Sequence, residues 1–153
     1  MDKNIVNELV SLLGKDNVLT EKEDKINYSY DATPGVKRYE PDVIVTPASK
    51  EDIIRLVKMA AKYKIPVVTR GAGTNLSGGT IPVDGGIVLS MLKLDKIIEV
   101  DAANLTATVE PGLIIQKLNE AAAAHGLIYP PDPGTVTTAT MGGSVSECSG
   151  GLR

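Results

Sequence analysis

Apolar residues recur at helical spacing in three stretches of the chain. These stretches predict helices over residues 4–13, 53–64 and 113–125. Gly14 and Gly126 follow the first and third stretches, at the position where helices commonly end. The second is preceded by Ser49-Lys-Glu-Asp52, which matches a capping box, and Pro66 prevents its continuation.

Short β-branched runs predict strands over residues 42–46, 67–69 and 87–90. The predicted helix 53–64 lies between the first two, so we expect a strand–helix–strand unit with parallel strands. Apolar residues alternate in residues 97–101 and 105–110, which predicts an antiparallel hairpin. Its shared apolar face would hold Ile98, Val100, Leu105, Ala107 and Val109. The pattern predicts an α+β fold with a βαβ N-terminal subdomain and an antiparallel hairpin region.

The first 40 residues differ in character from the rest. After the first predicted helix, residues 15–41 are polar and rich in turn formers. Three tyrosines are expected to anchor this segment on the body of the fold: Tyr28, Tyr30 and Tyr39. We therefore expect a lead-in over residues 1–40 and a domain over residues 41–153. The chain stops at Arg153, just after a glycine pair, and we expect this to be a cut within the domain.

Eleven of the 15 glycines fall in two short windows, from Gly71 to Gly86 and from Gly134 to Gly151. Glycine lets the backbone adopt positive φ and approach a ligand closely. An ordinary turn needs only one or two glycines. The clustering favours two loops shaped for one ligand over two turns without a ligand.

The first window, Thr69 to Thr80, follows a predicted strand, where phosphate-binding loops are found. A P-loop needs Lys where this chain has Gly79, and the dinucleotide-binding fingerprint meets Leu76 at its third glycine. Residues 77–82 oppose the start of a helix. A pyrophosphate would therefore be held by successive loop N–H groups rather than by a helix N-terminus. Arg70 would add positive charge or brace the loop.

In the second window, Thr140 is suited to cap a short helix that starts at Met141. Such a helix start would leave backbone N–H groups free for an acceptor. Gly142 and Gly143 would let a flat ring lie against the backbone.

The composition of the chain argues against several classes of protein function. The formal net charge is −3 and Trp and Phe are absent, which argues against nucleic-acid binding. A single Cys excludes a disulfide framework and a four-Cys zinc site, and we assign no metal site. No signal peptide is recognisable, and the longest uncharged stretch, residues 133–146, is too short and polar to span a bilayer. We expect a cytoplasmic protein.

Several motifs follow one another in order: Arg70-Gly-Ala-Gly-Thr-Asn-Leu-Ser-Gly-Gly-Thr80, Glu110-Pro-Gly112, Tyr129-Pro-Pro-Asp-Pro133 and Met141-Gly-Gly143, then Glu147 and Gly150-Gly151. Together they resemble the FAD-binding (PCMH-type) domain of the vanillyl-alcohol oxidase superfamily. The chain is most similar to the FAD-linked subunit of glycolate oxidase and to the flavin D-lactate dehydrogenases. The resemblance runs from about Tyr28 to the end of the chain. It implies the type-2 FAD-binding fold, here truncated, because members of the family are much longer.

The resemblance also implies how the cofactor is held. The first loop would bind the FAD pyrophosphate through backbone amides, and the Pro-Asp-Pro turn and the Gly-Gly segment would line the flavin. The residues assigned to FAD in this way are Arg70, Gly71, Ala72, Gly73, Thr74, Asn75, Ser77, Gly78, Gly79, Pro131, Asp132, Thr140, Met141, Gly142, Gly143 and Ser144. The first loop lacks the His to which some relatives attach FAD, so we expect FAD to be non-covalent.

By the same resemblance, the intact enzyme oxidises a 2-hydroxy acid of the glycolate or D-lactate type to a 2-oxo acid. The His and Arg residues that handle this substrate lie beyond the end of the chain, so we expect no catalytic residue in it and no turnover by it alone. An iron–sulfur or other electron-transfer subunit is the expected partner, with attachment to the inner face of the membrane through that subunit. The exposed strand edges of a truncated sheet predict self-association.

Two other interpretations stay open. A non-catalytic module would bind a cofactor or a partner and act with a separate chain. A nicotinamide-binding domain would be stabilised by NAD rather than FAD, although Leu76 disfavours it.

Overall fold

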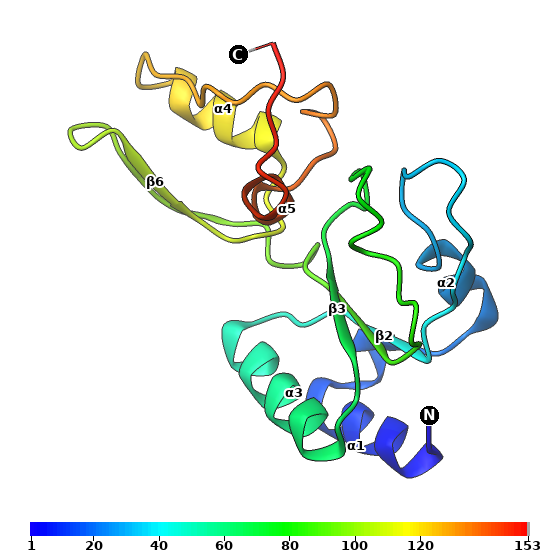
Figure 1. The fold of residues 1–153 in the computed structure, drawn as a ribbon. Helices are drawn as coiled ribbons and strands as arrows, with labels where there is room; N and C mark the ends of the chain where they lie inside the picture. The colour runs from blue at the N-terminus through cyan, green and yellow to red at the C-terminus, as the bar shows by residue number, and fades with distance from the viewer. Residues whose placement is uncertain (153) are drawn as a thin grey trace.

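The computed structural model describes residues 1–152, and Arg153, where the sequence predicts a cut, lies outside the described residues. The chain forms two lobes, which Figure 1 shows one above the other. The sheet lobe contains α1 (Lys3–Leu13), the 3-10 turn η1 (Lys15–Asn17), β1 (Val18–Leu19), α2 (Lys22–Asn27), β2 (Val43–Val45), α3 (Lys50–Tyr63), β3 (Val67–Arg70) and β4 (Ile87–Ser90). The hairpin lobe contains β5 (Ile97–Asp101), β6 (Thr106–Val109), α4 (Ile115–Ala123) and α5 (Met141–Ser146).

The sheet has the strand order β1-β2-β4-β3. β2 and β3 both run parallel to β4, with Ile44 and Val68 each opposite Val88. The predicted strand–helix–strand unit is confirmed, but β4 lies between its two strands. β1 adds an antiparallel edge that the sequence did not predict, because two residues are too few to show an alternating pattern. β3 forms the opposite edge, and the first glycine loop begins at its C-terminal end.

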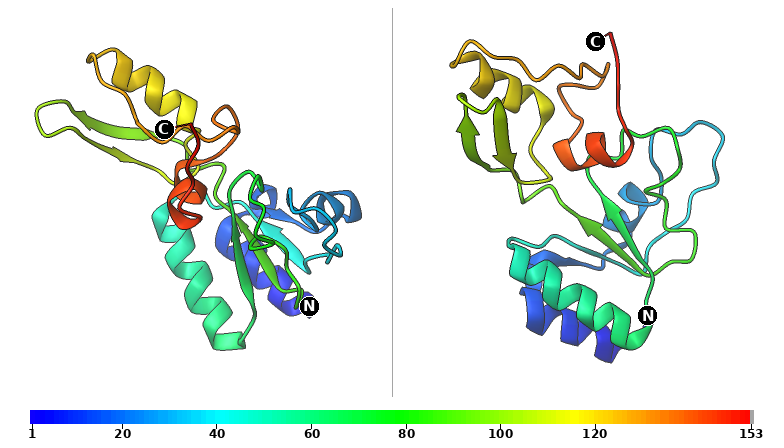
Figure 2. Two further views of the ribbon diagram at one scale, coloured as in Figure 1. Left: turned by 45° about the horizontal axis from the view of Figure 1, so that its top comes forward. Right: turned by 60° about the vertical axis from the view of Figure 1, so that its left-hand side comes forward.

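α1 and α3 pack side by side on one face of the sheet (Figure 2). The buried cluster between helices and sheet contains Leu9, Leu13, Val43, Val45, Leu56, Met59, Ile87 and Leu89. Ile44 and Val88 alternate with these residues along their strands and are also fully buried. Burial on both faces explains why the two central strands are continuous apolar runs rather than alternating ones.

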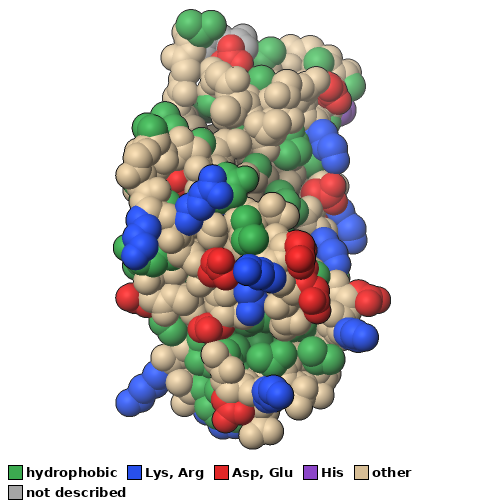
Figure 3. All heavy atoms as spheres, turned by 90° about the vertical axis from the view of Figure 1, so that its right-hand side faces the viewer, with side chains coloured by type: hydrophobic (Ala, Val, Ile, Leu, Met, Phe, Trp, Pro, Cys, Tyr) green, Lys and Arg blue, Asp and Glu red, His purple; other side chains and the backbone are tan. Residues whose placement is uncertain are grey.

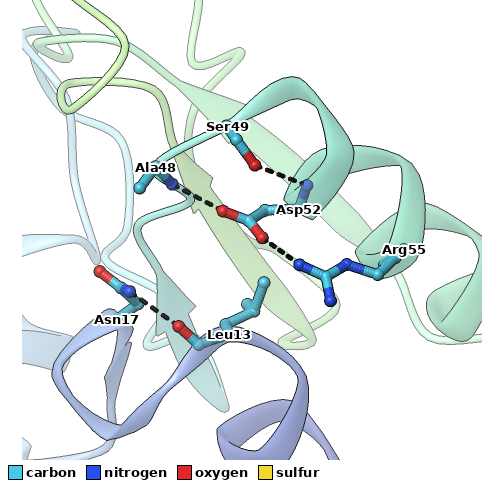
Figure 4. Close-up of polar contacts among 6 residues, drawn as sticks. All are labelled: Leu13, Asn17, Ala48, Ser49, Asp52 and Arg55. Atoms are coloured by element: carbon cyan, nitrogen blue, oxygen red, sulfur yellow. Dashed lines mark hydrogen bonds and ion pairs between the residues drawn. The ribbon is translucent and has the colours of Figure 1, made fainter.

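The N-terminus of α3 is capped as the sequence predicts, with one difference (Figure 4). The Asp52 N–H donates to Ser49 Oγ over 3.1 Å. The Asp52 carboxylate accepts from the Ala48 N–H at 3.1 Å and from the Arg55 guanidinium at 2.5 Å. In a standard capping box the acidic side chain returns to the N-cap residue itself, whereas here it returns one residue earlier.

The hairpin of β5 and β6 is confirmed, but part of its predicted apolar face is wrong. Ile97 lies opposite Val109, and both pack against the core of the hairpin lobe. An irregularity in the register follows Ile97 and interrupts the two-residue alternation. Ile98 is consequently 64% exposed, and Leu105, which lies in the turn before β6 with φ of 56°, is 72% exposed.

Two helices also differ from expectation. α2 lies within residues 15–41, which the sequence predicted to be turn-rich; its six residues are too few for an apolar stripe. α4 begins at Ile115 rather than at residue 113, because Ile114 is extended and forms a β-bridge with Thr140. That bridge joins the start of α4 to the second glycine window.

The cap of α3 predicts a pH dependence of stability. Burial raises the pKa of Asp52, but hydrogen bonds from Ser49, Ala48 and Arg55 outweigh it and leave the pKa below its ordinary value. The resulting stabilisation is present above the unfolded pKa of about 3.9 and is lost as the pH falls through the folded value. We expect Asp52→Asn to flatten the fall in unfolding free energy between neutral pH and about pH 3, measured by urea denaturation. Equal slopes in both proteins would contradict this role.

Candidate functional site

A cavity of about 560 Å³ lies where the first glycine loop meets the start of α5. Figure 1 shows α5 at the junction of the two lobes, above the C-terminal end of β3. Ten of the residues predicted to bind cofactor line this cavity: Gly71, Ala72, Gly73, Thr74, Asn75, Gly79, Thr140, Gly142, Gly143 and Ser144. The two windows that the sequence singled out therefore form one site, although some 60 residues separate them.

The backbone of the first loop is arranged to receive an anion. Gly73 and Gly78 both have φ of 72°, a conformation that suits glycine. Within residues 1–152, the N–H groups of residues 71–75 meet no hydrogen-bond acceptor. Polar groups left without a partner at the wall of a cavity are available to a ligand. No helix starts in this loop, as predicted.

Arg70 braces the loop and does not line the cavity. Its side chain is buried, and Nη1 donates to the Tyr30 carbonyl at 2.6 Å and to Thr80 Oγ1 at 3.2 Å. The guanidinium lies 5.4 Å from the centre of the Tyr28 ring and directly against Gly73, where a Cβ would collide with it. Burial lowers the pKa of Arg70, and nearby Tyr28 and Asp31 partly offset this. Of the two roles predicted for Arg70, the structure shows the bracing one.

Thr140 caps α5 as predicted, its Oγ1 accepting from the Gly143 N–H at 3.3 Å. The expectation of free N–H groups at this helix start is wrong. The Met141 N–H donates to the Leu113 carbonyl at 2.7 Å, and the Gly142 N–H donates to the Pro111 carbonyl at 2.8 Å. These bonds fix α5 to the chain that precedes α4, so the helix start shapes the cavity without offering amides to a ligand.

The other predicted residues stand outside the cavity lining. Met141 is buried in the hairpin lobe, and the Gly78 N–H is bound to Thr33 Oγ1 at 2.8 Å. Ser77 Oγ donates to Glu147 Oε1 at 2.9 Å. Pro131 and Asp132 belong to a turn against which Gly151 packs.

Glu147 lines the cavity, and the sequence analysis did not assign it to the site. Helical spacing carries the missing signal, because Glu147 is the C-cap of the helix that Thr140 caps and follows Gly143 by four residues, which places both on one side of it. Among the described residues of the lining, Glu147 is the one with an ionisable side chain. Its hydrogen bond with Ser77 joins the first glycine loop to the end of α5.

Three further properties of the described residues concern metal binding, membrane spans and surface charge. In residues 1–152, no group of three or more His, Cys, Asp or Glu side chains is arranged to hold a metal ion. Over the same residues, none of the helices is long and apolar enough to cross a membrane. On the face shown in Figure 3, acidic and basic side chains interleave.

Comparison with known proteins identifies the family. Residues 41–153 match the FAD binding domain family, and the chain belongs to it. The chain is 40% identical over 151 residues to the glycolate oxidase subunit GlcD of Bacillus subtilis, covering 99% of this chain and 32% of that protein. It is 42% identical over 129 residues to a D-lactate dehydrogenase of Archaeoglobus fulgidus, covering 82% of this chain and 29% of that protein. The chain thus spans about a third of the length of these relatives.

Solved structures agree with this assignment. An alkyldihydroxyacetonephosphate synthase superposes with a TM-score of 0.88 at 27% identity, covering 99% of this chain and 33% of that one. A p-cresol methylhydroxylase with bound substrate gives a TM-score of 0.83 at 28% identity, covering 95% and 29%. The PCMH-type FAD-binding fold predicted from the motifs is confirmed, and FAD is the cofactor of this family.

The cavity suits such a cofactor. Residues 71–75 offer a row of unpaired amides for a pyrophosphate, and Gly142 and Gly143 contribute backbone without side chains to the part of the lining formed by α5. Thr74, Asn75 and Ser144 add hydroxyl and amide groups around the lining. The described residues therefore fit a dinucleotide with a flat ring system.

The contact between the two loops can be tested at Gly71. A Cβ at this position would collide with Thr140 Oγ1, the oxygen that caps α5. We expect Gly71→Ala to displace this cap and cost about 1–2 kcal/mol of unfolding free energy in urea denaturation. Gly134→Ala is the matched control, because its Cβ would meet no atom within 4 Å. A Gly71→Ala protein as stable as the control would disprove the close approach.

Proposed function

We propose that this chain provides the FAD-binding part of a flavin-dependent oxidoreductase that oxidises a 2-hydroxy acid of the glycolate or D-lactate type. The observation that carries the proposal is the row of unpaired amides in residues 71–75, which line a cavity together with the Gly142-Gly143 segment. The relatives named as glycolate oxidase subunit and D-lactate dehydrogenase support the choice of substrate class.

In this proposal, the chain binds and orients the cofactor. The amides of residues 71–75 hold the pyrophosphate, Arg70 fixes the loop from beneath, and Gly142 and Gly143 bring the backbone close to the ring. The flavin supplies the hydride acceptor that oxidation of a 2-hydroxy acid requires. Since no His enters the first loop, attachment is non-covalent.

The chain does not itself supply acid–base chemistry in this proposal. Glu147 is the one ionisable side chain among the described lining residues, and it is bound to Ser77. General acid–base catalysis needs a titratable group within reach of the substrate proton. We therefore place the substrate-handling residues outside this chain.

Because the chain is similar to a glycolate oxidase subunit, we also propose that an electron-transfer subunit is its partner. We propose that the protein is cytoplasmic and that this subunit can attach it to the inner face of the membrane. The outer edge of β3 has no strand partner in residues 1–152, which supports self-association of the isolated chain.

Binding of FAD can be measured by thermal unfolding of the purified chain with and without excess FAD. A ligand at 100 times its dissociation constant adds about 2.7 kcal/mol, which is a rise of several degrees. We expect this rise with FAD and none with NAD, because the fingerprint for a nicotinamide dinucleotide fails at Leu76. A rise with NAD alone would favour the nicotinamide-binding alternative.

A second test asks whether the chain binds the cofactor but lacks the residues that handle the substrate. Glycolate or D-lactate, added without oxygen to the FAD-loaded chain, is expected to leave the flavin absorption unchanged, because the described lining offers no free base. The glycolate oxidase subunit of Bacillus subtilis, treated in the same way, serves as the control for reduction. Bleaching of the flavin in this chain would show that it contains a complete substrate site.

A further inference from the structure

A second layer of polar residues lies beneath the first glycine loop. It comes from the bracing segment, residues 28–33, which the sequence analysis placed in the lead-in rather than in the site. The centre of this layer is Asp31, a residue that is 8% exposed. A buried carboxylate is costly unless hydrogen bonds satisfy it, so its partners indicate what it does.

Both carboxylate oxygens of Asp31 are satisfied, and one of them binds the glycine loop. Oδ1 accepts from the Thr33 N–H at 2.9 Å. Oδ2 accepts from Asn75 Nδ2 at 2.7 Å and lies 3.2 Å from Thr80 Oγ1. Asn75 and Thr80 both line the cavity, at either side of the turn through Gly78. One buried charge thus holds both sides of the loop.

The backbone around Asp31 strengthens the same connection. The Ala32 N–H donates to the Gly73 carbonyl at 3.1 Å, and Thr33 Oγ1 accepts from the Gly78 N–H at 2.8 Å. From the other side, the Arg70 guanidinium donates to the Tyr30 carbonyl. Three consecutive residues after Tyr30 therefore each bind the loop, more than 40 residues along the chain.

Charge supports this arrangement. Burial raises the pKa of Asp31, but hydrogen bonds from Thr33, Asn75 and Thr80 outweigh it, and the pKa lies below its ordinary value. Arg70 and Asp31 both contact Thr80 Oγ1, and the Asp31 carboxylate partly offsets the lowering of the Arg70 pKa by burial. The carboxylate is thus ionised at neutral pH and is a strong acceptor for the loop.

The loop needs such a support. Its amides in residues 71–75 have no partner within the described chain, so no hydrogen bonds of their own hold them in place. A glycine-rich segment has many alternative conformations, and ordering it at the moment of binding would weaken affinity. Support from beneath removes this cost while leaving the amides free.

We propose that Asp31 is a positioning residue for the cofactor site, which through Asn75 and Thr80 holds the first glycine loop with its free amides converging on the cavity. This inference rests on the proposed FAD-binding function. It extends the site to a segment that does not line the cavity and lies outside residues 41–153.

Asp42 provides a matched control. Its carboxylate also accepts two hydrogen bonds, one from the Gly86 backbone N–H at 2.8 Å and one from the N-terminal amine at 3.0 Å. Its pKa is likewise lowered, since hydrogen bonds outweigh burial. It precedes β2, whereas the glycine loop follows the parallel strand β3, so the two carboxylates lie at opposite ends of the parallel strands. Asp31→Asn and Asp42→Asn therefore remove similar interactions at different distances from the site.

The test compares the full chain with both variants in two measurements. Isothermal titration with FAD is expected to give a dissociation constant at least roughly tenfold higher for Asp31→Asn, the effect of losing a charged hydrogen-bond acceptor. Asp42→Asn should stay within about twofold of the unmodified chain, because it does not reach the loop. Equal affinities for the two variants would overturn the proposal.

Hydrogen exchange of the protein without flavin separates the proposal from the function on which it rests. Asp31→Asn should accelerate exchange of the Ala32 and Gly78 amides and spare Gly86, and Asp42→Asn should do the reverse. Unchanged exchange at Ala32 and Gly78 in Asp31→Asn would overturn the positioning role. If the unmodified chain binds no FAD while this exchange pattern appears, the proposed function fails and the support of the loop stands. If Asp31→Asn does not fold, Asn75→Ala breaks the same link from the loop, with the same expected change in exchange.

Discussion

The site depends on the backbones of two lobes coming closer together than side chains would allow. Gly71 of the sheet lobe lies against the capping oxygen of Thr140 in the hairpin lobe, and within the hairpin lobe Gly142 lies against Pro111, so a methyl group at either glycine would overlap its neighbour. Gly112 is held in the same way against the carbonyl groups that follow β4. These contacts set the distance between the first glycine loop and α5, and that distance defines the cavity. Glycine is thus required here for packing between lobes as much as for the conformation of a loop.

The two loops differ in how their backbone N–H groups are used. α5 uses its first N–H groups on the Leu113 and Pro111 carbonyls and on the Thr140 hydroxyl, which secures its place against the chain before α4. The loop after β3 does the opposite, since its amides in residues 71–75 are left free and its stability comes from Arg70 and Asp31 beneath it. One wall is rigid because its backbone is satisfied. The other has an unsatisfied backbone, which is the feature that the proposed binding uses, and it is supported from outside by Arg70 and Asp31.

Much of this could be predicted from the sequence, because it is written in local patterns. Helical spacing located α1 and α3, β-branched runs located β2 to β4, and Thr140 before Met141 marked the cap of α5. The clustering of glycines located both walls of the cavity before any contact was known. Each of these features depends on a few consecutive residues, and that is the range over which propensity and periodicity carry information.

Apart from β1 and α2, which are too short to show a pattern, the failures arise from contacts that a single segment of sequence does not reveal. The N–H groups of α5 were expected to be free because their acceptors, such as Leu113, belong to another element. Ile98 was expected to be buried because a register irregularity cannot be seen in one strand alone. Asp31 was overlooked in a polar segment because only the fold brings it to Asn75, 44 residues away.

The distribution of charge gives the site its character. Arg70, the one cationic residue in the first loop, lies beneath the backbone and donates to a carbonyl and a hydroxyl, and it stands near Asp31. Glu147 adds a negative charge to the lining. An anionic ligand is therefore not attracted by net charge, and the favourable contribution must come from oriented N–H dipoles, which act over short distances. Such dipoles recognise a ligand by its geometry rather than by its charge. This explains why so many contacts in this small fold hold one glycine loop in a fixed shape.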